Sequence, residues 1–423
     1  MWCFAPGLPF HSQSGAGAPI YYKRCADFNT IPAMQLQLPE PSFDALAASR
    51  ALQDRIANDI RRNSGWISFA QYMELALYAP GLGYYSGGAA KLGKDGDFTT
   101  APEITPLFGA TLAQVVADLM AQTSPQILEF GAGTGKLARD ILTELDAMGF
   151  AVHRYCIVEV SGELRARQEE TLRGFPQVIW LDRFPTAFSG VVLGNEVLDA
   201  MPVNLVVKAE AGWQERGVAL SPNGFAFQDQ LCDAALAAAV AAQIPHAEEL
   251  PPGYVTEVHP IAAGFMHSLA AMLEAGYDES GHGGAALLID YGFPVHEYYL
   301  DQRAQGTLMC HYRHHAHPDP FYLPGLQDIT AHVDFTSMAR AAIDGGLDLL
   351  GYTSQAAFLL DAGIGDLLLR TSPDDLLRYL PQANAVQKLI SPAEMGELFK
   401  VLVLGKHAQL PHKFARNDRS HRL

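Results

Sequence analysis

The stretch that decides the fold runs from Gln126 to Asp140 and reads Q-I-L-E-F-G-A-G-T-G-K-L-A-R-D. Residues 127–130 form a mostly apolar run of the kind found in buried parallel strands. From Lys136 onward, apolar residues recur with helical spacing. The turn between the two is built on Gly131, Gly133 and Gly135. Because glycine permits positive φ and close approach of a ligand to the backbone, and because a helix N-terminus presents free N–H groups, this turn favours a small polar ligand.

Counting positions separates this turn from two familiar glycine motifs. A phosphate-binding loop would need Gly at 130 and Ser or Thr at 137, where the chain has Phe130 and Leu137. A dinucleotide fingerprint is weakened, because its sixth position is Lys136 rather than a small residue. The remaining pattern, acidic-x-Gly-x-Gly-x-Gly from Glu129 to Gly135, resembles the first motif of class I S-adenosylmethionine-dependent methyltransferases. A tight turn without a ligand is the open alternative.

Composition limits the possible functions. The chain has 423 residues, of which 49% are hydrophobic and 18% charged, so it can bury a large core. Its formal charge of -17 disfavours a nucleic-acid or anionic-membrane surface and favours a basic or neutral partner. The five cysteines are dispersed without metal-ligand spacing, which suits a reducing compartment. No apolar run approaches the ~18 residues of a membrane-spanning helix.

Glu159 is the next candidate cofactor residue. It lies near the end of the mostly apolar stretch at 155–160, about two dozen residues after the glycine turn. In α/β cofactor folds, a carboxylate at this position accepts hydrogen bonds from ribose hydroxyls. A solvated strand-end carboxylate is the other interpretation.

A cluster of polar residues follows the apolar run at 191–193. Asn195, Glu196 and Asp199 come directly after that run. Ligands of open parallel sheets bind beyond the carboxyl ends of the strands, so we expect these side chains beside the glycine turn. Capping of a helix that starts near Asn195 is the competing role.

Five long motifs occur along the chain: G-D-F-T-T-A-P-E-I at 96–104, the turn at 129–135, Gly194-Asn195-Glu196 through Pro202, L-I-D-Y-G at 288–292, and D-I-T-A-H-V-D-F at 328–335. Together they resemble the MidA family, bacterial and mitochondrial relatives of a complex I assembly-factor arginine methyltransferase. The resemblance runs from about Phe43 to Lys406.

The resemblance implies a fold and a domain plan. The fold is α/β, a Rossmann-like class I methyltransferase with a mostly parallel seven-stranded sheet whose last strand is antiparallel, preceded by an N-terminal helical region and interrupted by insertions. The expected divisions are an extension at 1–41 that is disordered or wrongly assigned, a helical and loop region at 42–120, the methyltransferase domain at 121–406 with insertions at 203–280 and 293–330, and a loose tail at 407–423.

The implied activity is methylation of a protein arginine, with S-adenosyl-L-methionine as cofactor. The implied partner is a respiratory complex I subunit or its bacterial equivalent, and the expected location is the bacterial cytoplasm rather than the mitochondrial matrix. Glu129, Gly131, Gly133, Gly135, Glu159 and Asn195 are the expected cofactor residues. Two other classes stay open: a methyltransferase for small molecules or nucleic acid, and a non-catalytic assembly factor that keeps the fold.

Arginine chemistry suggests roles for the polar cluster. The guanidinium is always charged and presents a planar fork that carboxylates match. Glu196 and Asp199 are therefore candidates for a clamp, with Asn195 orienting it. His332 and Asp334 are candidates to accept or relay the released proton, although packing or capping would also explain them.

Two irregular stretches are expected to wall the site. One runs from Gly81 to Glu103, and the other is the His-, Tyr- and Pro-rich segment from Phe293 to Pro324. Long irregular segments beside an active site often act as lids. Metal binding by the histidines is the alternative for the second stretch.

Overall fold

The computed structural model describes residues 38–87 and 99–423. Within this range, residues 41–423 form one compact unit. The expectations for the N-terminal extension and for Gly96, Asp97 and Phe98 concern residues outside the described part of the chain. None of the helices in the described part combines the length and the apolar character needed to cross a bilayer.

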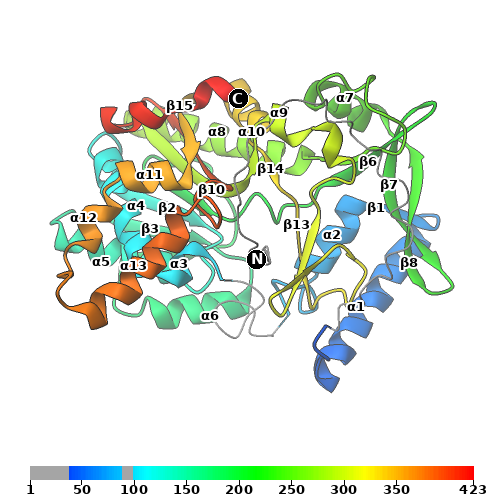
Figure 1. Cartoon of the computed structure of the whole chain (residues 1–423), viewed down its shortest axis with the longest axis horizontal. Helices are drawn as coiled ribbons and strands as arrows, with labels where there is room; N and C mark the ends of the chain where they lie inside the picture. Colours follow the sequence, from blue (N-terminus) through cyan, green and yellow to red (C-terminus); the bar gives the residue numbers. More distant parts are fainter. Residues whose placement is uncertain (1–37, 88–98) are drawn as a thin grey trace, which may run out of the picture. The chain divides into compact units, whose positions relative to one another are not determined.

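The central sheet has the predicted class I methyltransferase topology, with seven strands in the order β15-β16-β10-β5-β2-β3-β4 (Figure 1). All run parallel except β16, which pairs antiparallel with both of its neighbours. A short strand, β14, adds to the end of β10. The strand bounds are β2 Gln126–Phe130, β3 Arg154–Val158, β4 Val178–Leu181, β5 Val191–Asn195, β10 Gly284–Phe293, β14 Val333–Asp334, β15 Asp348–Ser354 and β16 Phe399–Lys406.

Helices cover both faces of this sheet, because successive strand side chains point to opposite sides. On β2, Ile127 packs in one core cluster, while Leu128 and Phe130 pack in another. The first cluster holds α4 Pro106–Met120, α5 Lys136–Ala147, α11 Gln355–Asp361, α12 Ile364–Leu368 and α13 Leu376–Ile390. The second holds α8 Pro260–Ser280 and α10 Phe335–Asp344. The short helix α3 Ala101–Ile104 and helix α6 Gly162–Thr171 lie at the glycine turn.

The insertions build two smaller sheets. The first contains β1 Trp66–Ser68, β6 Asn204–Ala209, β7 Gly212–Ser221, β8 Gly224–Leu231 and β9 Val255–Val258, and helix α7 Ala234–Gln243 packs beside it. Two N-terminal helices, α1 Phe43–Arg62 and α2 Phe69–Tyr78, share a core with this sheet. Helix α2 begins after Ser68, which forms a capping box with Gln71.

The His-rich segment is more ordered than predicted. It contains the helix α9 Val295–Tyr298 and the strands β11 Met309–Tyr312 and β12 His315–His317, which form a sheet with β13 Asp328–Thr330. Cys310 and Phe321 pack into the core shared with α1 and α2. Among the described residues, no three His, Cys, Asp or Glu side chains are grouped so that they could hold a metal ion.

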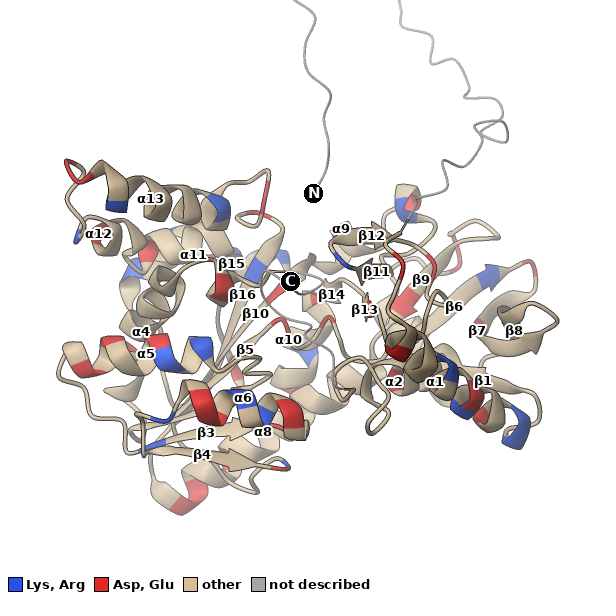
Figure 2. Cartoon of the chain, turned by 90° about the horizontal axis from the view of Figure 1, so that it is seen from below, with Lys and Arg blue, Asp and Glu red and all other residues tan. Residues whose placement is uncertain are grey.

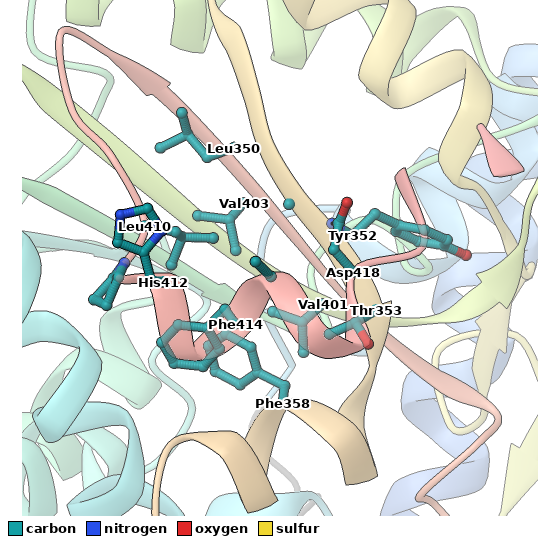
Figure 3. Close-up of a pocket in the computed structure, with 13 residues that line it drawn as sticks. Leu350, Tyr352, Thr353, Phe358, Val401, Val403, Leu410, His412, Phe414 and Asp418 are labelled. Carbon is teal, nitrogen blue, oxygen red and sulfur yellow. The ribbon is translucent and has the colours of Figure 1, made fainter. Parts of the chain in front are cut away.

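The tail after His407 packs against the edge of the central sheet, where a loose tail was expected. Phe414 is buried and stacks on Phe358, with ring centroids 5.0 Å apart. The Asp418 carboxylate accepts a hydrogen bond from the backbone N–H of Tyr352 at 3.0 Å, so the tail covers the edge strand β15. Figure 3 shows the pocket of about 170 Å³ between the tail and β15–β16. The pocket's strands β15 and β16 lie at one edge of the sheet, whereas β3, which Glu159 follows, lies next to the edge strand β4 on the other side.

Candidate active site

The glycine turn has the backbone conformation that its sequence suggested. Gly131, Gly133 and Gly135 have φ values of 65°, 53° and 79°, all in the left-handed region. A Cβ at Gly131 would lie 2.9 Å from Val197 Cγ2, so the turn and the end of β5 approach closely.

Helix α3 holds the same turn from the other side. The Thr134 hydroxyl donates to the Glu103 carboxylate at 2.6 Å. Lys136 donates to the carbonyl of Pro102. The segment at 99–104, which sequence analysis assigned to one of the walls, therefore contacts the glycine turn directly.

Glu159 lies immediately after β3 and is held by a buried glutamine. Its carboxylate accepts hydrogen bonds from the backbone N–H of Ser161 at 2.7 Å and from Gln168 Nε2 at 2.9 Å. The same Gln168 Nε2 also donates to the Gly133 carbonyl at 3.0 Å. The Gln168 side-chain oxygen accepts a hydrogen bond from the Trp180 indole N–H at 2.9 Å. Burial raises the pKa of Glu159, and these hydrogen bonds oppose the shift. Gln168 was not predicted from the sequence, because it is one of several polar residues on α6 and has no distinctive spacing from the glycines or from Glu159.

Glu129 occupies a buried position inside the sheet. It is 2% exposed, and its carboxylate accepts a hydrogen bond from the Tyr155 hydroxyl at 2.8 Å. Burial raises the pKa of Glu129 to about 7, and the bond from Tyr155 opposes that rise. Its predicted contact with the cofactor stays a prediction, because its described hydrogen bond is to the neighbouring strand.

The polar cluster after β5 surrounds one strained residue. Glu196 has φ of +54°, a conformation that non-glycine residues adopt rarely and that is frequent at functional sites. Its backbone N–H donates to the Ile289 carbonyl at 2.8 Å, and its side chain accepts a bond from Asn195 at 3.0 Å. The backbone of Ala101 in α3 also hydrogen-bonds to the Glu196 carboxylate. Asn195 and Glu196 therefore meet the segment that holds the glycine turn.

Asp290, which sequence analysis quoted only as part of a family motif, holds the turn that follows Glu196. One of its carboxylate oxygens accepts hydrogen bonds from the backbone N–H groups of Val197, Leu198 and Asp199 at 3.1, 2.8 and 3.3 Å. No helix begins in the described stretch after Asn195, since β5 is followed by a turn and then β6, and the backbone N–H groups of this turn are satisfied by Asp290, on β10. The Glu196 and Asp199 side chains therefore do not act as helix caps here.

The cluster concentrates negative charge. Burial and then the neighbouring Asp199 raise the pKa of Glu196 to about 8. Burial also raises the pKa of Asp199 to about 6, against a hydrogen bond from Tyr291, and it raises the pKa of Asp290. Asp199 is 5% exposed, and its Oδ1 has no hydrogen-bond partner among the described residues. A buried oxygen of this kind is costly unless a donor binds it.

Tyrosines form a wall beside these acids. The Tyr85 hydroxyl donates to both carboxylate oxygens of Asp328, at 3.0 and 3.1 Å. Tyr78 stacks on Tyr85 with centroids 5.5 Å apart, and its hydroxyl donates to the Ala200 carbonyl at 2.9 Å. Tyr78, Tyr85 and Asp328 come from α2, the loop after it and β13, so no local sequence spacing could have grouped them.

His332 and Asp334 have surroundings that differ from those expected of proton acceptors. The His332 ring stacks on Phe293 with centroids 5.3 Å apart, and burial lowers its pKa to about 4. The role of His332 as a proton acceptor stays a prediction, and these surroundings favour the packing role instead. Asp334 is fully buried, and its carboxylate accepts from the backbone N–H groups of Thr336 and Ser337, which makes it the N-cap of α10.

Comparisons with known proteins agree with this site. Residues 107–353 match the model of a family described as S-adenosyl-L-methionine-dependent methyltransferases. The mitochondrial protein arginine methyltransferase NDUFAF7 of Rattus norvegicus is 31% identical over 386 residues, covering 82% of this chain and 83% of the relative. The Homo sapiens protein of the same name is 30% identical over 398 residues, covering 85% and 84%.

A solved structure is closer still. A protein from Burkholderia thailandensis, crystallised with bound S-adenosyl-homocysteine, is 54% identical, with a TM-score of 0.85 over 91% of this chain and 100% of that chain. The parallel sheet, the glycine turn and these matches lead to one conclusion. The chain belongs to the MidA family of S-adenosyl-L-methionine-dependent methyltransferases.

Proposed function

We propose that this methyltransferase modifies an arginine side chain of a protein partner. The observation that carries the proposal is the acidic cluster beside the glycine turn, in which the partly buried Glu196 lies with the buried Asp199, Asp290 and Asp328. Several carboxylates whose charges repel one another, one with an unpaired oxygen, favour a cationic ligand. A guanidinium has five donors in a rigid fork and suits such a site better than a neutral acceptor would.

The proposed cofactor site is the turn at 131–135 together with Glu159 and Asn195. The left-handed glycines leave backbone room for a ligand. The Glu159 carboxylate accepts from Ser161, Gln168 and the backbone of Val160, and an ionised carboxylate has about four acceptor positions, so it could still accept a bond from a ribose. Asn195 Oδ1 is a buried acceptor without a described partner. These residues fit the polar portions of S-adenosylmethionine.

For methyl transfer, the protein needs to orient the acceptor and to stabilise charge. When bound, S-adenosylmethionine supplies a methyl group that is already electrophilic. Glu196 and Asp199 would hold the guanidinium so that one nitrogen faces this methyl, and would stabilise the positive charge during transfer. After the N–C bond forms and the S–C bond breaks, the surplus proton on the guanidinium passes to a carboxylate of the cluster. The pKa of Glu196 is about 8 without an acceptor, and a guanidinium bound beside it would lower this pKa, so that the ionised carboxylate could take up the proton.

The proposed partner is a protein, as the names of the NDUFAF7 relatives suggest. The family resemblance implies a respiratory complex I subunit or a bacterial equivalent. The net charge of -17 would assist the approach of a basic segment. A cytoplasmic location fits the Burkholderia relative, which is bacterial.

The direct test is to incubate the purified protein with isotope-labelled S-adenosylmethionine and a protein extract of its own cells. Acid hydrolysis followed by amino-acid analysis should place the label in methylated arginine. Label found only in small molecules, nucleic acid or another amino acid would contradict the proposal.

A further inference from the structure

A second pocket lies between α1 and α2, next to the acidic cluster. Its volume is about 260 Å³, and its lining includes Asp59, Ile67, Glu74, Leu75 and Tyr78. Sites for drug-sized ligands usually measure ~300–1,000 Å³, so this pocket suits a single long side chain better than a separate small molecule.

Tyr78 connects this pocket to the proposed acceptor site. The residue lines the pocket, yet its hydroxyl donates to the carbonyl of Ala200, the residue after Asp199. Its ring also stacks on Tyr85, which hydrogen-bonds to Asp328. One side chain therefore separates the pocket from the acidic cluster, and an extended peptide could reach both.

The lining matches a basic side chain. Leu75 and the exposed ring of Tyr78 supply apolar surface that the methylenes of a lysine or arginine could cover. Glu74 is exposed and forms no ion pair in the part of the chain that the structure describes, while Asp59 pairs with Arg62 across 3.6 Å at the surface. Figure 2 shows acidic residues on both α1 and α2. Arg55 is the one cation of the lining, and because Asp59 already pairs with Arg62, Glu74 is the lining carboxylate that a basic side chain would meet.

We propose that this pocket binds a second basic side chain of the protein substrate, a few residues from the arginine that is methylated. The proposal rests on the proposed function, because it places the methylated arginine at Glu196 and Asp199. Glu74 would then select substrates in which basic residues are paired, and Tyr78 would separate the two side chains.

The test uses the full chain with saturating S-adenosylhomocysteine and fluorescein-labelled peptides. Each peptide carries one arginine and one lysine separated by about two to about five residues, since an extended chain advances ~3.3–3.6 Å per residue. Matched peptides replace the lysine, or the arginine, with norleucine. Binding is measured by fluorescence anisotropy for the wild type, Glu74→Gln and Asp54→Asn. Asp54 is an exposed acid on the same helix α1 as Asp59 that does not line the pocket.

At one or more spacings, the lysine should tighten binding to the wild type and to Asp54→Asn by about five-fold, corresponding to ~1 kcal/mol for a partly exposed charged contact. Glu74→Gln should lose this gain and bind the arginine-only peptide as the wild type does. Equal affinity for lysine and norleucine peptides at every spacing, or a gain that survives in Glu74→Gln, would overturn the docking proposal. If instead the Glu74-dependent gain is present but replacing the arginine changes nothing, and a parallel incubation with S-adenosylmethionine in place of S-adenosylhomocysteine methylates no peptide, the pocket stands and the proposed function fails.

Discussion

Gln168 donates one hydrogen bond to Glu159, at 2.9 Å, and through the same nitrogen reaches the backbone carbonyl of Gly133 at 3.0 Å. A fully buried glutamine thus fixes the distance between the glycine turn and the acid proposed to bind the ribose. Because both partners belong to the proposed cofactor site, Gln168 should affect cofactor affinity without touching the cofactor.

Replacing Gln168 with Leu tests this relationship. The change keeps the volume but leaves the Gly133 carbonyl and the Trp180 indole N–H without partners, which costs ~1–3 kcal/mol for a buried polar group. We expect affinity for S-adenosylhomocysteine, measured by calorimetry, to fall about ten-fold or more. Glu169→Ala, on the exposed side of the same helix, is the control and should bind normally. Normal binding by Gln168→Leu would show that the network does not position Glu159.

Gly131→Ala tests the close approach of the turn to β5. An alanine at φ of +65° carries a backbone penalty of ~1–2 kcal/mol, and its Cβ would also lie 2.9 Å from Val197 Cγ2. Gly149→Ala has a similar penalty at φ of +80°, but with nothing within 4 Å of the added carbon. We expect both variants to lose stability by urea unfolding, with a somewhat larger loss for Gly131→Ala, and only Gly131→Ala to lose cofactor affinity. Equal affinity in both variants would disprove a ligand site at this turn.

The acidic cluster predicts a specific dependence of stability on pH. The pKa of Glu196 is about 8 in the folded protein and near 4.5 in an unfolded chain, so the folded state holds a proton that the unfolded state releases. The free energy of unfolding should therefore fall as pH rises from about 4.5 to about 8, by ~2 kcal/mol after allowance for partial exposure.

Urea unfolding at about pH 5.5 and about pH 8.5 measures this effect. Glu196→Gln should show a smaller loss of stability between the two values, because the amide cannot ionise. Asp182→Asn, which changes a carboxylate whose side chain is 86% exposed, should behave as the wild type. An identical pH dependence in wild type and Glu196→Gln would mean that Glu196 is not held in a charge-repelling environment.

Glu196→Gln also separates catalysis from binding of the cofactor. The variant loses a charge-assisted hydrogen bond to the guanidinium, worth ~1.5–3 kcal/mol, together with the proposed proton acceptor. Cofactor affinity and melting temperature should stay close to wild type. The rate of methyl transfer to an arginine-containing protein should fall by about ten-fold to about a hundred-fold. Parallel losses of melting temperature and activity would instead favour a structural role for Glu196.

The central sheet and one half of the site were predictable because their signals are local. The apolar run before Gly131 and the glycines themselves specify a strand and a left-handed turn within ten residues. Glu159 follows the neighbouring strand β3, and the topology of a parallel sheet brings strand ends to one edge.

The other half of the site depends on contacts between distant segments. Asp290 meets Leu198 across 92 positions, and Tyr85 meets Asp328 across 243. No rule of secondary structure predicts that residues so far apart in the sequence should touch. For His332, the residue type alone left proton relay and packing open, and only the structure shows that burial beside Phe293 lowers its pKa.

The most direct test of the account is quantitative mass spectrometry of methylated arginine in cells that lack this protein. We expect one or a few methylarginine peptides to disappear, to return with the wild-type gene, and to remain absent with Glu196→Gln expressed at the same level. Methylarginine peptides that are unchanged by the deletion, or restored equally by Glu196→Gln, would contradict arginine methylation at the acidic cluster.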